Sequence, residues 1–166
     1  MKNTVRIIAA VMLAVIAAAF MTGCTGNNTQ RDYVVTDLSK KIFDNCSFED
    51  EYLAEVEDRA FALNLYDIDA SLVAEENGVK QSSIYLSSAY PEMIVCVKAV
   101  DANAAKGVEE AMRALINNYI QNYSNYQPAQ INKLETAVIR TAGEYVVVAV
   151  TNDNAASAKY IDSIFK

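Results

Sequence analysis

The side chains that could perform chemistry in this chain are mainly carboxylates and cysteines, because the sequence contains 21 acidic residues, three cysteines and no histidine. Without an imidazole, Ser/His/Asp hydrolases, Cys/His hydrolases and His-ligated zinc enzymes are excluded. The sequence has no Gly-x-Ser-x-Gly elbow, phosphate-binding Gly-rich loop or Cys-x-x-Cys pair. A calcium loop counted from Asp67 ends at Gly78, where a glutamate is required. We therefore expect no cofactor and no metal site.

Two further catalytic chemistries, a Ser/Lys pair and a carboxylate pair, have weaker sequence signals. Ser163 and Lys166 fit a Ser-x-x-Lys pattern, but they are among the final residues, where a fraying helix cannot hold a nucleophile beside its base. A pair of carboxylates brought together by folding can hydrolyse a glycosidic bond and has no local sequence signature. Carboxylate chemistry therefore stays open, and no catalytic residue is assigned.

One cysteine has a clear chemical role in its sequence context. Lys2 and Arg6 precede an uncharged apolar stretch that ends at Met21–Cys24, and this stretch is shorter than the roughly 20 apolar residues that span a bilayer. Met-Thr-Gly-Cys resembles the bacterial lipobox, with Met21 in place of the usual Leu. We predict a lipoprotein signal peptide over residues 1–23 and diacylation of Cys24, which would hold the protein stably on the membrane. The alternatives are a cleaved secretory peptide or an uncleaved anchor.

The residues after Cys24 predict a tether and then an acidic domain. Residues 24–32 offer almost nothing apolar to bury and suit a flexible tether, followed by a single globular domain over 33–166. Removal of residues 1–23 takes away Lys2 and Arg6 and no acid, which changes the formal charge from −7 to −9. Such a domain repels nucleic acid and anionic headgroups, so we expect no nucleic-acid partner and contact with the membrane through the lipid alone.

The apolar and polar periodicity predicts the following elements. In the first half of the domain, the sequence indicates a helix over 36–47 capped by Thr36, an acidic run over 49–58 that forms a solvated loop or a cation site, and a hairpin at Asn77-Gly78. A strand over 93–100 follows, and then a helix from Asp101 or Asn103 to about Tyr126 and a short turn at Pro128. The last elements are strands over 136–140 and 144–150, joined by residues 141–143, and a closing helix capped by Asn152 or Asp153.

Together these elements predict an α+β domain, with an antiparallel sheet of about four strands and helices mainly on one face. The segments 97–105 and 148–156 look alike at an offset of 51 residues, which indicates either a duplicated hairpin-then-helix unit or a recurring strand-to-helix junction.

Cys46 and Cys96 are expected to be buried free thiols, with a disulfide as the alternative.

Three tyrosines on the long helix have two interpretations. Tyr119, Tyr123 and Tyr126 could line a carbohydrate or peptide groove. The first two, however, lie on the helix stripe that we expect to be buried, which favours core packing.

Nearly all of the predicted mature chain resembles a known family. The run from Met93 to Asp101, the long helix ending in Tyr-x-x-Tyr, Pro128, and the strands at 135–139 and 143–148 are similar to a family of uncharacterised Gram-positive lipoproteins that share one domain of unknown function. The resemblance implies a fold and assigns no functional residues.

These observations lead to one expected function and one alternative. We expect a non-enzymatic lipoprotein on the extracytoplasmic face of the cell membrane, which binds another envelope protein or a wall component. The alternative is an envelope hydrolase that uses a carboxylate pair.

Overall fold

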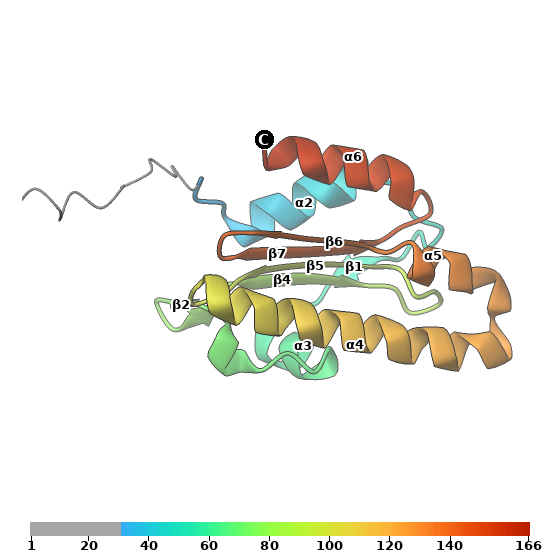
Figure 1. Cartoon of the computed structure of the whole chain (residues 1–166), viewed down its shortest axis with the longest axis horizontal. Coiled ribbons are helices and arrows are strands. Elements are labelled where there is room, and N and C mark those ends of the chain that lie inside the picture. Colours follow the sequence, from blue (N-terminus) through green and yellow to red (C-terminus); the bar gives the residue numbers. More distant parts are fainter. Residues whose placement is uncertain (1–30) are drawn as a thin grey trace, which may run out of the picture. The chain divides into compact units, whose positions relative to one another are not determined.

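An antiparallel sheet with the strand order β1-β4-β5-β7-β6 lies at the centre of the fold (Figure 1). The computed structural model describes residues 31–166. The strands of this sheet are β1 (Ala54–Glu55), β4 (Ser82–Leu86), β5 (Met93–Lys98), β6 (Val138–Ala142) and β7 (Tyr145–Val150). A separate two-stranded hairpin is formed by β2 (Glu75–Glu76) and β3 (Val79–Lys80).

Strands β5 and β7, which are neighbours in the interior of the sheet, are buried on both faces. Side chains of a strand alternate between the faces of a sheet, so Val95 and Val97 contribute to one apolar cluster and Ile94 and Cys96 to another. All six residues of β7 are buried as well. The continuous apolar runs of β5 and β7 therefore fill two cores at once.

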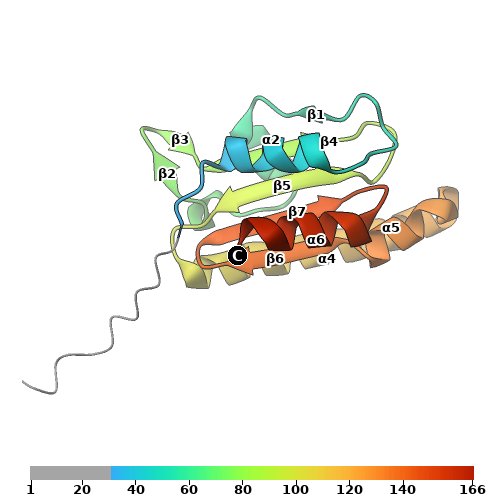
Figure 2. The ribbon, with the colours of Figure 1, turned by 90° about the horizontal axis from the view of Figure 1, so that it is seen from above.

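Helices cover both faces of the sheet (Figure 2). Helices α2 and α6 pack on the face of Ile94 and Cys96, and α3 and α4 pack on the face of Val95 and Val97. The helical segments are α2 (Val35–Asn45), α3 (Arg59–Leu65), η1 (Ala70–Leu72), α4 (Ala102–Tyr126), η2 (Pro128–Gln130), α5 (Ile131–Glu135) and α6 (Asn154–Ile164).

The predicted α+β class with an antiparallel sheet is confirmed. The structure differs in two details: the sheet has a fifth strand, the two-residue β1, and helices lie on both faces instead of mainly on one. The reason is the composition of β5 and β7, because a strand that is apolar on both sides needs cover on both sides.

Short-range signals place several element boundaries. The Asp101 carboxylate accepts hydrogen bonds from the backbone N–H groups of Asn103 and Ala104 at 2.8 and 2.7 Å and so caps α4. Asn77 and Gly78 have φ angles of +53° and +78°, as a two-residue hairpin turn with both central residues left-handed requires. The predicted cap and the predicted turn are confirmed.

The beginning of α2 and the acidic run differ from prediction. Thr36 lies inside the first turn and does not cap it, because the helix begins at Val35, whose side chain is 1% exposed in the core. Within the acidic run, Asp50 is buried and accepts a hydrogen bond from the Ser87 hydroxyl at 2.5 Å. The run is therefore only partly solvated.

Both predicted hairpin-then-helix units form, but they have opposite hands. Strands β5 and β7 are antiparallel neighbours at the centre, with β4 and β6 outside them. Because α4 and α6 follow these strands on opposite faces, no rotation superposes β4-β5-α4 on β6-β7-α6. The sequence similarity therefore reflects a strand followed by an Asx-capped helix, and not a symmetric duplication.

Candidate functional site

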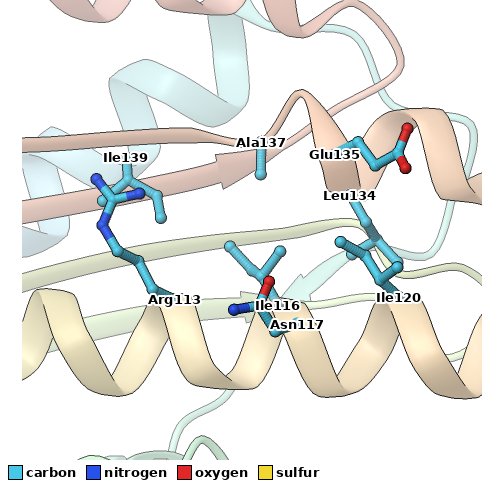
Figure 3. Close-up of a pocket in the computed structure, with 8 residues that line it drawn as sticks. All are labelled: Arg113, Ile116, Asn117, Ile120, Leu134, Glu135, Ala137 and Ile139. Atoms are coloured by element: carbon cyan, nitrogen blue, oxygen red, sulfur yellow. The ribbon is translucent and has the colours of Figure 1, made fainter.

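A groove of about 200 Å³ runs between α4 and the start of the edge strand β6 (Figure 3). Its middle is apolar, and it has a cation at one end and an anion at the other, since Arg113 lies beneath Ile139 and Glu135 lies at the far end near Leu134 and Ile120. The lining residues are Arg113, Ile116, Asn117, Ile120, Leu134, Glu135, Ala137 and Ile139.

The periodicity of α4 and β6 brings these side chains together. On α4 the lining residues are spaced at i, i+3, i+4 and i+7, starting from Arg113, which places them on one face of the helix. On the strand side, Ala137 and Ile139 are two residues apart and therefore point toward the same face. The groove forms where the helix stripe and the strand face diverge at the edge of the sheet.

The backbone of β6 is unpaired on its outer side in the described sheet, because β6 is the last strand and bonds only to β7. A two-residue turn makes Ala142 and Tyr145 a hydrogen-bonded pair, and such pairs alternate along an antiparallel ladder. The N–H and C=O groups of Ile139 and Thr141 consequently point outward. Arg140 Nη1 donates a hydrogen bond to the Ile139 carbonyl oxygen at 3.0 Å, so one outward acceptor already has a partner.

Charged side chains lie along both faces of this edge. On the α4 face, Glu109 accepts hydrogen bonds from the Thr141 hydroxyl at 2.6 Å and from Arg113, with Nη2 at 2.8 Å, and these two contacts lower the pKa of its carboxyl. On the α6 face, Arg140 binds Asp162 with both Nε and Nη2, which lowers the pKa of Asp162. The edge therefore carries one arginine–carboxylate ion pair on each face, Arg113 with Glu109 and Arg140 with Asp162.

A second polar cluster lies around Lys133, in the middle of α5. The fully buried Glu92 carboxylate accepts a hydrogen bond from Lys133 Nζ at 2.9 Å and from the backbone N–H groups of Glu49 and Asp50, each at 2.9 Å. Lys133 also donates to Glu49 at 2.6 Å. Desolvation opposes the charge on Lys133, but its contacts with the two glutamates outweigh this effect and raise its pKa. The cluster ties the loops around residues 49 and 92 to α5.

Glu49 and Glu92 provide a test of the hydrolase alternative, since both carboxylates bind one ammonium group. A general acid of a glycosidase needs a raised pKa. The hydrogen bond from Lys133, followed by that from Gln130, instead lowers the pKa of Glu49. The Lys133 side chain also occupies the position between the two acids. This carboxylate pair is therefore suited to fixing loops and not to protonating a leaving group.

The tyrosines of α4 divide between core and surface. Tyr119 and Tyr123 pack against the core on the α4 face, while Tyr126 is 60% exposed. Core packing is thus confirmed for the first two.

The two thiols in the described residues are free, with Cys96 buried and Cys46 half-buried. Burial raises the pKa of both thiols. Cys24, the predicted signal peptide and the tether up to residue 30 lie outside the described residues.

The sequence analysis did not identify the groove or the Lys133 cluster. Lys133 and Glu92 are 41 positions apart, and Arg113 and Glu135 come from different elements, so neither pair leaves a local pattern. The one available signal was Glu92, a charged residue directly before the apolar run Met93–Val97. In residues 31–166, no helix is long and apolar enough to cross a membrane, and no cluster of three or more His, Cys, Asp or Glu side chains could hold a metal ion.

The fold thus belongs to the class of small α+β domains with a helix-covered antiparallel sheet and a groove at one edge. Residues 47–151 match the DUF4358 family, described as a domain of unknown function, and the chain belongs to this family. The groove and the Lys133 cluster lie within the matched residues. No curated protein and no solved structure matches the chain.

Proposed function

We propose that this protein is an extracytoplasmic lipoprotein of the cell membrane, anchored by a diacylated Cys24, and that its DUF4358 domain binds another envelope protein or a wall component. The anchoring half is supported by the sequence: a short basic start, an apolar stretch and Met21–Cys24 have the order of a lipoprotein signal. The two acyl chains of one diacylglyceryl group, joined to the Cys24 sulfur by a thioether bond, bury enough methylene groups for stable attachment.

The binding half is supported by one structural observation, the groove between α4 and β6. It combines apolar side chains with outward backbone groups at an unpaired sheet edge, and these are the features that protein recognition sites use. Its lining side chains come from α4, α5, β6 and Ala137, which joins α5 to β6, and these segments pack on the core, so the site is formed before a partner arrives.

Metabolic labelling of the full chain with palmitate in a bacterial host tests the anchor. We expect label on the wild-type chain and none on Cys24→Ser, with Cys46→Ser as the matched control that keeps its label. Label that persists on Cys24→Ser, or a full-length precursor that stays soluble in the cytosol, would refute the anchoring half.

Site-specific crosslinking in cells tests the binding half. A photoreactive residue at Asn117, exposed on the groove, should give a discrete adduct. The same residue at Lys159, exposed on α6, is the control and should not give this adduct. Equal adducts at both positions, or none at Asn117, would contradict binding at the groove.

A further inference from the structure

We infer that the end of the domain from which the chain leads back to Cys24 contacts the membrane surface through three exposed side chains, Val34, Val79 and Val100, which we call the valine surface. The inference rests on the proposed anchoring of Cys24 and deepens it by naming the part of the domain that touches lipid.

The first described residues are fastened to the folded domain. The Asp32 carboxylate accepts hydrogen bonds from Lys98 Nζ at 3.0 Å and from the Tyr145 hydroxyl. The Tyr33 N–H donates to the Tyr145 hydroxyl, and the Tyr33 hydroxyl donates to the Ile164 carbonyl oxygen, each at 3.0 Å. The point from which the chain leads back to Cys24 is therefore fixed on the domain at Asp32, the last residue of the predicted tether.

The length of chain before Asp32 limits the distance between this end of the domain and the membrane. Asp32 is eight residues after Cys24 in the sequence, and eight residues span at most about 29 Å when fully extended. Helix α4 begins at the same end of the domain (Figure 1), and its 25 residues give it a length of about 37 Å. A lipid on Cys24 therefore holds the Asp32 end close to the bilayer, whereas the far end of α4 can lie more than twice as far away.

One ammonium group brings three segments together at this end. Lys98 Nζ, at the end of β5, binds Asp32 at 3.0 Å and Glu76 of the β2–β3 hairpin at 3.3 Å. Figure 2 shows the same arrangement, because the hairpin, the end of β5 and the start of α2 all lie at the end where the described chain begins. We call these three side chains the Lys98 contact.

The valine surface surrounds the Lys98 contact. Val34 and Val100 each lie two residues after a member of this contact, and Val79 is the cross-strand partner of a third member. All three side chains are about half exposed, between 46% and 59%. Apolar side chains around the point where an anchored chain enters its domain have a bilayer within reach, and they bury their surface at the boundary between headgroups and acyl chains.

Ion pairs reduce the repulsion between this end and anionic headgroups. Lys80 binds Glu75 at 3.1 Å, and Lys98 binds two further carboxylates. The expected contact through the lipid alone followed from the charge of the whole domain, but near the valine surface lysines offset most of the acids in these pairs. Because an anchor keeps the domain at a high local concentration beside the bilayer, a small apolar contact is sufficient to orient it.

This orientation assigns the two ends of the domain to different partners. Segments η2 and α5 lie at the end opposite to the Lys98 contact (Figures 1 and 2). With the valine surface on the bilayer, these segments point away from the membrane, where an envelope protein or a wall component is met.

Quenching by spin-labelled lipid tests the contact. The lipidated full chain is reconstituted into vesicles of phosphatidylethanolamine and phosphatidylglycerol that carry a nitroxide on the headgroup. A fluorophore is attached at Val100→Cys or, as the far-end control, at Tyr126→Cys, both in a Cys46→Ser background, while the buried Cys96 does not react. We expect quenching at Val100→Cys to be at least about three times that at Tyr126→Cys, because most of the length of α4, about 37 Å, separates the two labels.

Two double variants test the role of the valines. Val34→Gln with Val79→Gln should reduce the quenching of the Val100→Cys label by at least about half, because it removes the apolar contact that orients the domain. Tyr52→Gln with Tyr126→Gln is the matched control, with two exposed apolar side chains replaced outside the valine surface, and it should leave the quenching unchanged. Thermal melting checks that each variant folds as the wild type does.

Two results would overturn the inference: equal quenching at the two ends of α4, and quenching of the Val100→Cys label that is unchanged in the valine double variant. Palmitate label on Cys24, measured on the same samples, separates these results from a failed anchor. With label present, they overturn the membrane contact and leave the anchor in place. Without label, the anchor itself is refuted, and the membrane contact with it.

Discussion

The substitution Glu92→Gln is the sharpest test of the Lys133 cluster, because it changes the charge of a fully buried side chain without changing its size. The carboxylate has three donors within 2.9 Å: the backbone N–H groups of Glu49 and Asp50 and the Lys133 ammonium. A glutamine replaces one acceptor oxygen with an NH₂ group, so at least one buried donor then faces another donor.

The expected loss follows from these contacts. An orphaned buried donor costs about 1–3 kcal/mol, and the removal of one partner from a buried ion pair costs about 3–5 kcal/mol. Lys133 keeps its 2.6 Å contact with Glu49, which places the loss at the lower end. We expect Glu92→Gln to reduce the free energy of unfolding by about 3 kcal/mol and the Tm by about 10 °C.

Urea unfolding of residues 25–166, followed by far-ultraviolet circular dichroism, measures this loss. The matched control is Glu51→Gln, the same chemical change at an exposed loop position, which should stay within about 0.5 kcal/mol of wild type. A double-mutant cycle with Lys133→Met should give a coupling energy of at least about 1 kcal/mol. A Glu92→Gln loss no larger than that of the control would refute the assigned role of the cluster.

Three further predictions concern other features of the described residues. Asp101→Ala removes the cap of α4 and should cost about 1 kcal/mol in urea unfolding, while Asp101→Asn should retain most of the stability. The Tyr66 hydroxyl is buried with no hydrogen-bond partner among the described residues, so Tyr66→Phe should leave the free energy of unfolding unchanged or raise it by up to about 1 kcal/mol, and a clear loss would reveal a partner. Contacts with Lys133 and Gln130 lower the pKa of Glu49 in the folded state. The contribution of Glu49 to the free energy of unfolding is therefore present above the ordinary glutamate pKa of about 4.3 and is lost as the pH falls through the lower folded-state pKa. Glu49→Gln should flatten the loss of stability between pH 5 and pH 3, and an unchanged slope would contradict this.

Much of the fold could be predicted from the sequence because its signals act over a few residues. The Asp101 carboxylate caps N–H groups two and three positions later, and Gly78 supplies the positive φ that its turn requires. The extent of α4 follows from its apolar stripe and from Pro128. In each case the interacting groups are close in sequence, so the residue types alone decide the outcome.

The prediction of helices mainly on one face shows the limit of such signals. Periodicity indicates that β5 and β7 are apolar on both sides, but not which helix covers which side. The capping signals that begin α4 and α6 are also alike, although the two helices lie on opposite faces. Thr36 has the residue type of a cap, yet the burial of Val35 decides where α2 begins.

The sequence by itself therefore determined several local elements, among them the Asp101 cap of α4 and the turn at Asn77-Gly78, together with the acidic charge and the candidate lipid site at Cys24. Only the tertiary structure decided the two-sided cover of the sheet, the union of Glu92 with Lys133, and the placement of Arg113 and Glu135 at the two ends of one groove. The physical reason is that a capping or turn contact acts between neighbours in the chain, whereas burial and ion pairing depend on which distant segments the packed core brings within a few ångströms.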